Sequence, residues 1–406
     1  MGKQKLGILG GTFDPVHAGH VQMAQCALDH GAVDQLLMMP TGNPPYKDCF
    51  TPQEDRWKML VAACAQDERL IPSRIEMDRE GPVYTVDTLR EVLHLYPRAD
   101  VYYLIGSDAV MKLKNWRGVK EVLSLCRFLV CPRTTEVELQ AFRHELAELT
   151  AMGGRFTILP MDPVNVSSTE VRTTAMAGLP APNLCVSVRE YIAARGLYGH
   201  PRRIRESEFW LDQLFTALNP HRFAHSLSVA FTARQLARLH GVNPVQAEQG
   251  GLLHDCAKCL PVREMQRIAR EHALTDDPAI LASGALLHSL VGAWVARNQY
   301  HMADPEVLES IAYHNTGFPG MSRLSMCVCL ADFMEPNRGT SPLLERVRLL
   351  SQLSLERALL LSLEGTADYV LSRGKALHPR TQDTITWLKS LPDTGSPPPA
   401  KAAKRN

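Results

Sequence analysis

The spacing of apolar residues changes near the midpoint of the chain, and this change constrains the fold more than any other feature of the sequence. In the first half, short strand-like runs alternate with amphipathic stretches such as TPQEDRWKMLVAACAQ and TVDTLREVLHLYP. From Glu208 onward the strand-like runs stop, and apolar residues recur every three to four positions. Alternation of strands and helices predicts a parallel sheet covered by helices on both faces, whereas the second pattern predicts helices alone.

The first half predicts six strands at a spacing typical of strand–helix–strand units. Near-continuous apolar runs such as DVYYLIG fit strands that are buried on both faces. The fold class that follows is α/β, a doubly wound parallel sheet, followed by an all-α domain. The predicted strands are Leu6–Leu9, Gln35–Pro40, Leu70–Glu76, Asp100–Ile105, Phe128–Cys131 and Phe156–Leu159.

A chain of 406 residues is too long for one ordinary core, which favours two domains. We expect the first domain over residues 1–198 and the second over residues 208–391. The basic, glycine-bearing stretch between them, residues 199–207, predicts a solvated linker. The proline-rich, polar residues 392–406 predict a disordered tail.

Composition excludes several classes of function. The net charge of +1 provides no broad positive field, so we expect neither nucleic acid nor an anionic membrane as a partner. No apolar run is long enough to span a membrane, and the N-terminus lacks the apolar core of a signal peptide. Ten cysteines, scattered through apolar stretches, indicate reduced thiols and a cytoplasmic protein. We expect Cys256 and Cys259 to pack within a helix rather than to bind a metal, and the oligomeric state stays open, a homo-oligomer included.

The segment GILGGTFDPVHAGH has the features of a phosphate site at the end of the first strand. Gly10 and Gly11 would form a turn that lets backbone N–H groups approach a phosphate closely. A helix that starts near Gly19 would point its positive end the same way, with His17 and His20 on one face of its first turn. Taken alone, the segment also fits an ordinary glycine turn with two surface histidines.

The stretch TFDPVHAGH resembles the signature of the H-x-G-H adenylyltransferase superfamily, and its companions are similar to those of bacterial nicotinate-nucleotide adenylyltransferases. The companions are GNPPYKD, YTVDTL, LIGSDA followed by NW, VCPR and VNVSSTEVR, in the family's order over residues 1–198. The resemblance implies a Rossmann-like nucleotidyltransferase of NAD biosynthesis. Such an enzyme joins ATP and nicotinate mononucleotide into deamido-NAD and pyrophosphate, with Mg²⁺ bridging the phosphates.

The same resemblance implies roles for individual residues. His17 and His20 would be catalytic, holding the ATP phosphates and stabilising the transition state. Trp116 would stack on the nicotinate ring, although a core position is the ordinary place for a tryptophan, and Arg133 equally fits a surface charge. The family loop usually has a histidine where Tyr46 stands, which puts the role of that position in doubt. The implied ATP-binding residues are Gly10, Gly11, Thr12, Phe13, His17, His20, Arg133, Ser168, Thr169 and Arg172, and the implied mononucleotide-binding residues are Lys47, Thr85, Asp108 and Trp116.

In the second half, four histidines and two aspartates lie on or at the end of successive apolar helical stretches. One histidine on an apolar helix face is more often a core residue than a ligand, but six such groups are harder to explain as packing. Buried imidazoles and carboxylates need partners, and a shared metal satisfies them together. With nitrogen and oxygen ligands, the candidate metals are Fe, Mn, Mg, Co and Zn. The six residues are His225, His254, Asp255, His288, His314 and Asp332.

This pattern resembles the HD superfamily, in particular the bacterial HD-domain hydrolases that cut diadenosine tetraphosphate symmetrically into two ADP. The segments HDCAK, YHNTGFPGMS and ADFMEPNR carry the resemblance over residues 208–391. It implies one or two divalent metals, Fe or Mn. The first would be held by His225, His254, Asp255 and Asp332, and a second by Asp255, His288 and His314.

Two cations follow the metal motifs. Lys258 and Arg338 would bind phosphate oxygens, with surface salt bridges as the equally favoured alternative. Ser289 and Leu290 stand where the family tends to have Ala-Pro, which should affect packing more than metal binding.

Together the two halves predict a bifunctional enzyme with ATP, nicotinate mononucleotide and a dinucleoside polyphosphate as its small-molecule partners. Two alternatives stay open. The transferase could use a different mononucleotide, since preference between acid and amide cannot be derived from these residues. The HD domain could act on another nucleotide, or only sense nucleotides, although it retains all six predicted ligands.

Overall fold

The computed structural model describes residues 3–42, 51–132, 139–162, 166–177, 181 and 183–392 of the chain. It divides into two compact units, Met1–Arg202 and Arg203–Asn406, and the division falls within the stretch predicted as a linker. The predicted tail lies outside the described residues except for Pro392. Each unit is described by itself.

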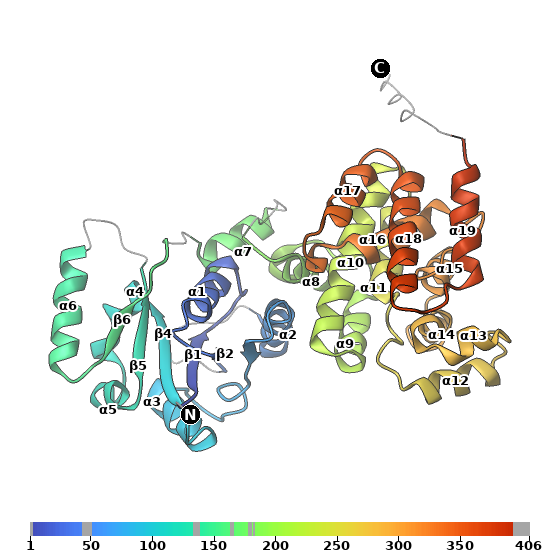
Figure 1. The fold of residues 1–406 in the computed structure, drawn as a ribbon. Helices are drawn as coiled ribbons and strands as arrows, with labels where there is room; N and C mark the ends of the chain where they lie inside the picture. The colour runs from blue at the N-terminus through green and yellow to red at the C-terminus, as the bar shows by residue number, and fades with distance from the viewer. Residues whose placement is uncertain are drawn as a thin grey trace. The chain divides into compact units, whose positions relative to one another are not determined.

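The first unit is a six-stranded parallel sheet with helices on either side of it (Figure 1). Its strands are β1 (Lys5–Gly11), β2 (Gln35–Pro40), β3 (Leu70–Pro72), β4 (Asp100–Gly106), β5 (Arg127–Cys131) and β6 (Phe156–Ile158). Its helices are α1 (Ala18–Asp29), α2 (Gln53–Cys64), α3 (Thr85–Leu95), α4 (Ser107–Val110), η1 (Leu113–Asn115), α5 (Val119–Leu125), α6 (Leu139–Ala151), α7 (Ser168–Met176), α8 (Val186–Arg195) and η3 (Leu197–Gly199).

The strands lie in the order β3-β2-β1-β4-β5-β6, so the sheet grows outward from β1 in both directions. Central strands of this kind are buried on both faces, and Ile8, Leu37 and Phe128 accordingly belong to the core. The α/β fold is therefore as predicted. The third strand is shorter than expected, because it ends at Pro72 and Glu76 instead lies buried beyond it.

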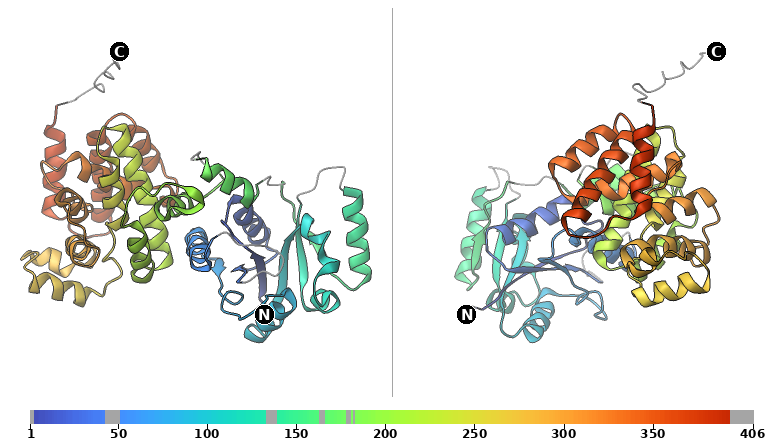
Figure 2. Two further views of the ribbon diagram at one scale, coloured as in Figure 1. Left: turned by 180° about the vertical axis from the view of Figure 1, so that it is seen from behind. Right: turned by 45° about the vertical axis from the view of Figure 1, so that its right-hand side comes forward.

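The second unit is helical throughout its described residues (Figure 2). Four of its helices begin with the same signal, an Asn or Asp whose side chain accepts from the first turn, followed by proline: Asn219, Asn243, Asp277 and Asp304. The helices are α9 (Ser207–Ala217), α10 (Pro220–Leu239), α11 (Pro244–Leu253), α12 (Val262–Glu271), α13 (Pro278–Ala282), α14 (Gly284–Asn298), α15 (Pro305–Tyr313), α16 (Arg323–Met334), η4 (Pro336–Arg338), α17 (Pro342–Ser351), α18 (Leu355–Ser372) and α19 (Pro379–Ser390).

Helices α10 and α11 have the most extensive contact of any helix pair among the described residues of this unit, and Gly251 helps to explain why. A Cβ at position 251 would lie 2.9 Å from the Cα of Ala230 and 3.0 Å from the Val229 carbonyl oxygen. Only glycine therefore lets the end of α11 approach the middle of α10. This contact helps to fix the position of His254, one turn beyond Gly251, relative to α10.

The stretch predicted as a solvated linker is partly ordered by a buried ion pair. Arg203 donates to both carboxylate oxygens of Glu248, which is 1% exposed and also pairs with Arg234. Arg203 is therefore anchored rather than fully solvated, because the buried carboxylate of Glu248 needs cations, and the linker role of the stretch stays a prediction.

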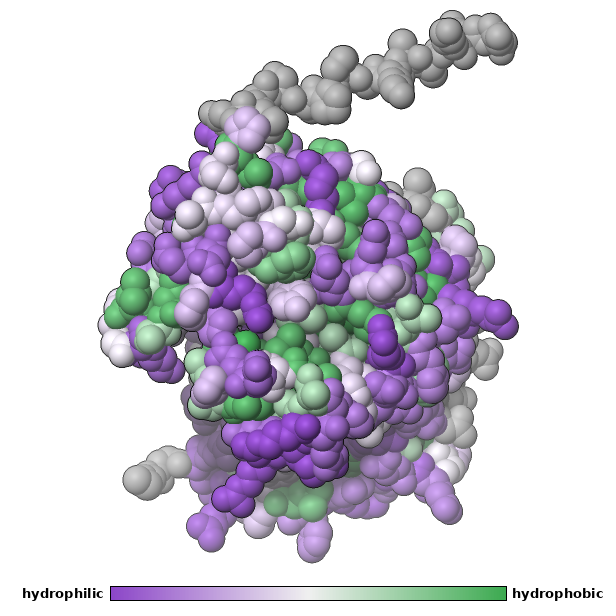
Figure 3. Space-filling view, turned by 90° about the vertical axis from the view of Figure 1, so that its right-hand side faces the viewer, coloured by the Kyte–Doolittle hydropathy of each residue, from purple (hydrophilic) through white to green (hydrophobic). Residues whose placement is uncertain are grey.

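One face of the molecule combines hydrophobic and hydrophilic side chains. Figure 3 shows a face on which hydrophobic side chains gather in separate patches between hydrophilic ones. Within the described ranges, we find no helix whose length and apolar character would allow it to cross a membrane.

Candidate active sites

A cavity of about 280 Å³ lies at the carboxyl ends of β1 and β4 in the first unit. These strands are neighbours in the sheet, although two other strands separate them in the chain. Open parallel sheets bind ligands at this kind of position, because the connections leave the two strands in opposite directions. The predicted site residues on the cavity wall are Gly10, Gly11, His20, Thr85, Asp108 and Trp116. Residues predicted for ATP and residues predicted for the mononucleotide thus share one cavity.

Tyr103 on β4 lies on the wall of this cavity, close to both Gly10 and Trp116. A Cβ at Gly10 would lie 2.7 Å from the Tyr103 hydroxyl oxygen, so position 10 must be glycine while that hydroxyl stands there. The Tyr103 ring also meets Trp116 edge-on, with centroids 6.0 Å apart. Sequence reasoning missed Tyr103 because it lies in a run assigned to the core. The usable signal was a tyrosine in a buried strand, whose hydroxyl needs a polar partner.

His17 and His20 stand together at the start of α1. His17 precedes the helix and is buried, and His20 is its third residue. The ring centroids are 3.7 Å apart, and Phe13 meets the His20 ring edge-on at 4.9 Å. The His17 backbone N–H donates to Nδ1 of His20 over 3.3 Å, which places the proton of a neutral His20 ring on Nε2. The Nε2–H group of His20 and the positive end of α1 make a donor site suited to phosphate oxygens.

The start of α7 closes against the turn that precedes α1. Ser168 donates through its hydroxyl to the carbonyl of Pro15 over 3.2 Å. Arg172 donates to the carbonyl of Asp14 over 2.6 Å and to the Thr169 hydroxyl over 3.2 Å. The predicted phosphate-clamp residues therefore lie beside the phosphate turn, and Arg172 contacts its backbone. That they close on a triphosphate stays a prediction.

The remaining predicted residues of the first unit are placed as follows. Thr85 is the first residue of α3, Asp108 lies exposed in the first turn of α4, and Trp116 is half-buried after η1. Lys47 and Arg133 lie outside the described residues.

Glu76 also lines the cavity, and sequence reasoning missed it as well. Burial raises the pKa of this carboxyl group, and hydrogen bonds from Thr88 and Thr41 oppose the shift. The Thr88 hydroxyl donates to Oε1 over 2.9 Å. The cavity thus has one carboxyl group that is buried and another, that of Asp108, that is exposed.

In the second unit, the six predicted metal-binding residues converge from five helices. His225 lies on α10, His288 on α14 and Asp332 on α16, whereas His254 and His314 stand at the ends of α11 and α15. All except Asp332 are buried, and Asp332 is partly buried.

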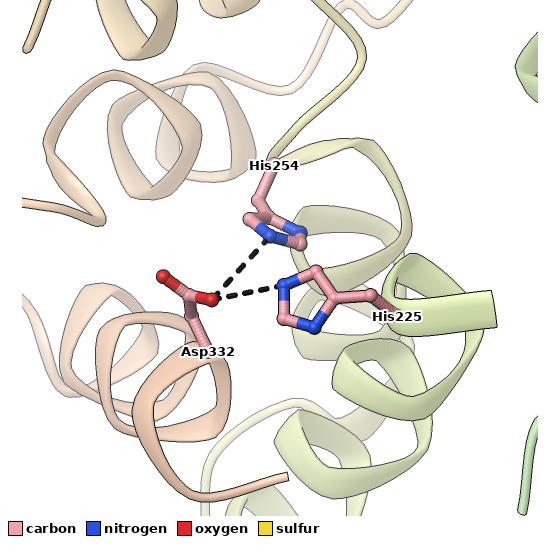
Figure 4. A group of neighbouring side chains, drawn as sticks. All are labelled: His225, His254 and Asp332. Carbon is pink, nitrogen blue, oxygen red and sulfur yellow. Dashed lines mark hydrogen bonds and ion pairs between the residues drawn. The ribbon is translucent and has the colours of Figure 1, made fainter. Parts of the chain in front are cut away.

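One group of ligand atoms consists of His225, His254 and Asp332 (Figure 4). Both rings turn Nε2 toward the same carboxylate oxygen, Oδ1 of Asp332, at 3.0 Å from His225 and 3.8 Å from His254. A second group consists of His254, Asp255 and His314, so His254 belongs to both. The predicted first site also included Asp255, which the structure places with the second group.

His288 completes the surroundings of Asp255. Its Nε2 lies 3.1 Å from Oδ1 of Asp255 and 3.1 Å from Nε2 of His314. Nε2 of His314 is 3.8 Å from the same Asp255 oxygen. Three ligand atoms, from His288, His314 and Asp255, therefore converge.

The donor atoms of this centre fit a cation. The Nδ1 atoms of His254 and His314 donate to the carbonyls of Gly251 and Ile311 over 2.7 and 2.8 Å, so their Nε2 lone pairs face the carboxylates. Nε2 of His254 is buried and has no hydrogen-bond partner among the described residues. Lone pairs that point at carboxylates repel each other unless a cation stands between them, so a divalent metal suits this set of nitrogen and oxygen donors.

The protonation states of the groups around Asp255 agree with that fit. Burial lowers the pKa of His288 and of His314 to about 4, so both rings are neutral at neutral pH. Burial alone would raise the pKa of Asp255, but the surrounding His254, His288 and Lys258 hold it well below its usual value. Neutral imidazoles and an ionised carboxylate are the forms in which these groups bind metals.

Three cations surround the two aspartates. Arg222 donates to Oδ2 of Asp255 over 2.9 Å, and Arg338 donates to Oδ1 of Asp332 over 2.6 Å. Nζ of Lys258 lies 3.0 Å from Nε2 of His288, and burial lowers the Lys258 pKa. Lys258 and Arg338 are therefore parts of the centre rather than remote surface pairs. Sequence reasoning missed Arg222, which stands one helical turn before a predicted ligand.

Glu335 is a second residue that the sequence did not single out. It is 1% exposed, and its Oε1 lies 3.1 Å from Nδ1 of His225, on the side of the ring opposite Asp332. A carboxylate in this place orients the ring and raises its basicity. The signal that could have found it is its position one turn beyond Asp332.

Two family models match the chain. The first, described as cytidylyltransferase-like, matches residues 8–174, and the second, the HD domain, matches residues 222–337. They fall on the two units separately and cover the phosphate turn and all six predicted metal-binding residues.

One curated relative matches about half of this chain, and another matches most of it. A probable nicotinate-nucleotide adenylyltransferase of Corynebacterium kroppenstedtii is 37% identical over 209 residues, which are 51% of this chain and 96% of the relative. A probable nicotinate-nucleotide adenylyltransferase/Ap4A hydrolase of Mycoplasma genitalium is 29% identical over 340 residues, which are 83% of this chain and 89% of the relative.

Two solved structures resemble one half each. A predicted HD superfamily hydrolase involved in NAD metabolism from Clostridium acetobutylicum is 32% identical, with a TM-score of 0.44, and covers 45% of this chain and 96% of its own. The Plasmodium falciparum nicotinic acid mononucleotide adenylyltransferase complexed with NaAD is 15% identical, with a TM-score of 0.42, and covers 49% of this chain and 98% of its own.

Proposed function

We propose two activities for this chain, which belongs to the nicotinate-nucleotide adenylyltransferase family and carries an HD domain in its second unit. The first unit transfers AMP from ATP to nicotinate mononucleotide. The second unit hydrolyses diadenosine tetraphosphate to ADP. The observation that carries the first activity is the shared cavity, which His20 and Gly10 line together with Thr85 and Trp116. For the second activity it is the ring of histidines around Asp255.

The transfer needs positioning rather than a nucleophile from the protein. A phosphate oxygen of the mononucleotide attacks the α-phosphorus of ATP, the bond from that phosphorus to the bridging oxygen breaks, and pyrophosphate leaves. Nε2–H of His20 donates to phosphoryl oxygens as charge grows on them, and the positive end of α1 attracts the same charge. Mg²⁺ would neutralise the triphosphate, as it does in other phosphoryl transfers.

The choice of mononucleotide depends on the part of the cavity lined by Trp116 and Thr85. Trp116 offers a ring for stacking on the pyridine, and the Thr85 hydroxyl stands at a helix start that favours a negative group. The stacking ring suits any pyridine nucleotide, and the helix start at Thr85 supports the acid over the amide. The buried carboxyl of Glu76 opposes a second negative charge when it is ionised, and burial raises its pKa and so favours its neutral form.

In the second unit, the residues that would hold the metals are the six that converge around Asp255 and Asp332. We propose Fe or Mn, and a bound divalent ion would supply an activated water and neutralise phosphoryl charge. Arg222, Lys258 and Arg338 surround the same carboxylates and are placed to bind further phosphate oxygens.

A cavity of about 600 Å³ gives the substrate room beside this centre. Its lining includes His314, Asp332 and Arg338 of the centre and also apolar and aromatic side chains of α17 and α18, such as Leu343 and Tyr369. A lining with both charged and apolar side chains suits a phosphate chain joined to a nucleoside. The cavity thus supports a nucleotide substrate, with diadenosine tetraphosphate as the proposed one.

A chromatographic assay tests the transfer. The purified chain is incubated with ATP, Mg²⁺ and either nicotinate or nicotinamide mononucleotide, and pyrophosphate and the dinucleotide are measured. We expect deamido-NAD from the acid at the higher kcat/KM. A higher kcat/KM for the amide would correct the substrate, and absence of pyrophosphate with both would overturn the transferase.

A second incubation tests the hydrolysis. The chain receives diadenosine tetraphosphate with Fe²⁺ or Mn²⁺, and we expect ADP as the only product. Cleavage of another nucleotide, with this one left intact, would show that the proposed substrate is wrong. Binding of nucleotides without turnover, in a chain that retains no metal by elemental analysis, would favour a sensing module instead.

A further inference from the structure

Arg56 is a buried cation of the first unit that neither the sequence motifs nor the cavity wall explains. It lies on α2 and is 0% exposed. Charged side chains are rarely buried so completely unless they are paired. The neighbouring carboxylate of Asp55 already binds Arg195 and Tyr191. Nε of Arg56 has no hydrogen-bond partner in the described part of the chain.

The partners of Arg56 are backbone carbonyls at the ends of two neighbouring strands. Its Nη1 donates to the carbonyls of Thr12 and Thr41, each over 2.8 Å, and Nη2 donates to the carbonyl of Gly42 over 3.4 Å. Thr12 follows β1, whereas Thr41 and Gly42 follow β2. One guanidinium nitrogen therefore joins the two segments at the edge of the sheet where the cavity opens.

Both segments are fixed around this contact as well. The Thr41 N–H donates to the carbonyl of Gly11 over 2.9 Å, and Gln53 donates to the carbonyl of Gly42 over 2.8 Å. A Cβ at Gly42 would lie 2.5 Å from the Glu76 carbonyl oxygen, so the backbone passes there at the closest approach a glycine allows. The distance between the two strand ends is thus set by a few direct contacts, with Arg56 as the central one.

We propose that Arg56 is a positioning residue for adenylyl transfer, which sets the spacing between the turn after β1 and the segment after β2. The inference rests on the proposed transferase activity. Thr12 belongs to the turn predicted to hold ATP, and Gly42 opens the motif predicted to hold the phosphate of the mononucleotide. In-line attack requires the two phosphate sites at one fixed separation, and an error of about 1 Å costs roughly 100-fold in rate.

The planar fork of arginine is what this place requires. Two hydrogens on one nitrogen point in different directions and reach both carbonyls at once, while the second nitrogen reaches Gly42. Lysine would keep the positive charge and much of the length, but its ammonium group is a compact point that lacks this fixed geometry. The Arg56→Lys variant therefore separates position from charge.

The experiment compares the full-length wild type, Arg56→Lys and Arg74→Lys in the pyrophosphate assay, with both substrates varied. Arg74 is the matched control, because it is partly exposed and pairs with Glu54 and Asp78 at the surface. We expect kcat of Arg56→Lys to fall about 10–100-fold, with each KM changed less than about threefold, since each segment still holds its own substrate. Arg74→Lys should stay within about twofold of wild type.

A role in stability alone would give a different result, namely a lower melting temperature with unchanged kcat per folded molecule. Arg56→Lys with wild-type kcat, or with the loss confined to KM, would overturn the inference. Should Arg56→Lys fold poorly by circular dichroism, Arg56→Ala is tested with added guanidinium ion, which should restore kcat saturably where methylammonium does not. Absence of this rescue would also overturn it. Wild-type protein that releases no pyrophosphate would instead overturn the proposed function.

Discussion

Glu76 in the first unit and Asp255 in the second are both buried carboxyl groups, yet their pKa values move in opposite directions. Burial dominates at Glu76, whose nearest partners are the hydroxyls of Thr88 and Thr41. At Asp255 the effect of burial is outweighed by the surrounding His254, His288 and Lys258, and Arg222 donates to the same carboxylate. One carboxyl group is held toward its neutral form and the other is held ionised.

The two sites differ in the same way as their carboxyl groups. The site of the first unit is built from backbone, namely strand ends, a glycine turn and a helix start, so its partial charges belong to the fold itself. The centre of the second unit is built from full charges and lone pairs on side chains of five helices. A single substitution should therefore damage the second site more severely than the first.

The sharpest test of this contrast is Asp255→Ala. The change removes the carboxylate that faces three histidines, so we expect hydrolysis of the dinucleoside polyphosphate to fall roughly a thousandfold or more. Pyrophosphate formation should be unchanged, because it belongs to the other unit. Both rates are measured on the same preparation, together with its metal content, which should also fall.

Asp368→Ala is the matched control for this variant, since Asp368 is an exposed carboxylate on α18 of the same unit. It should retain both activities. If Asp255→Ala also abolished pyrophosphate formation, the two units would not be independent catalysts.

The corresponding test in the first unit is His20→Ala. It removes one side-chain donor but leaves the glycine turn and the N-terminus of α1, so we expect kcat of the transfer to fall about 100- to 1,000-fold rather than vanish. Hydrolysis should be unaffected. Steady-state kinetics of pyrophosphate release provide the measurement.

His30→Ala serves as the control at the opposite end of the same helix, where the exposed ring bonds only local groups. It should leave kcat near the wild-type value. Should His20→Ala lose more activity than Asp255→Ala loses in its own reaction, the ranking of the two sites would be wrong.

The third test concerns the frame of the second site rather than its ligands. In Gly251→Ala, the new Cβ would meet the backbone of Ala230 at 2.9 Å, so α10 and α11 must separate. We expect the free energy of unfolding of the second unit to fall by about 1–3 kcal/mol, as is usual for overpacking in a rigid core. Thermal unfolding monitored by circular dichroism should show a lower transition for this unit alone.

Gly292→Ala is the control, because a Cβ there would find its nearest neighbour at an ordinary 3.4 Å and alanine favours a helix interior. It should be neutral or slightly stabilising. An unchanged transition in Gly251→Ala would mean that the two helices have freedom that their close packing does not suggest.

The two sites also differ in how well the sequence predicted them. Strand periodicity and the glycine turn predicted the sheet, and the motifs led to His20, Thr85 and Trp116 around one cavity, because backbone sites leave local patterns. The six residues of the metal centre were likewise visible as polar groups on apolar helices. Their division into a first and a second metal site stays a prediction, since it depends on how helices far apart in the chain pack. The structure places Nε2 of His254 3.6 Å from a carboxylate oxygen of Asp255 and 3.8 Å from one of Asp332.

What the sequence concealed follows a common physical rule. Arg56, Glu76 and Tyr103 lie within stretches that look like ordinary helix, strand end and core, and Glu335 and Arg222 act through residues one helical turn away. Their roles arise from burial and from partners distant in sequence. Neither property has a local signature that one sequence displays.

The smallest expected effect is the pH dependence that Glu76 gives to the first unit. The ordinary pKa of a glutamate is 4.5, and burial raises that of Glu76 in the folded state. Since the folded state holds this proton more tightly than the unfolded state, protonation stabilises the unit. That contribution is fully present below about pH 4.5 and is lost as the pH rises through the folded-state pKa. In Glu76→Gln, the amide keeps the acceptor for the Thr88 hydroxyl but cannot titrate.

The measurement is the free energy of unfolding of the first unit, by urea titration, at a series of pH values from 4 upward in steps of about half a unit. The wild type minus Glu76→Gln difference should become less favourable to the wild type as pH rises, and Glu80→Gln, at an exposed position nearby, should give a flat difference. An increase with pH would mean that Glu76 is held ionised like Asp255. The two units would then treat their buried carboxyl groups alike, and the contrast between a site made of backbone dipoles and a site made of charges would no longer hold.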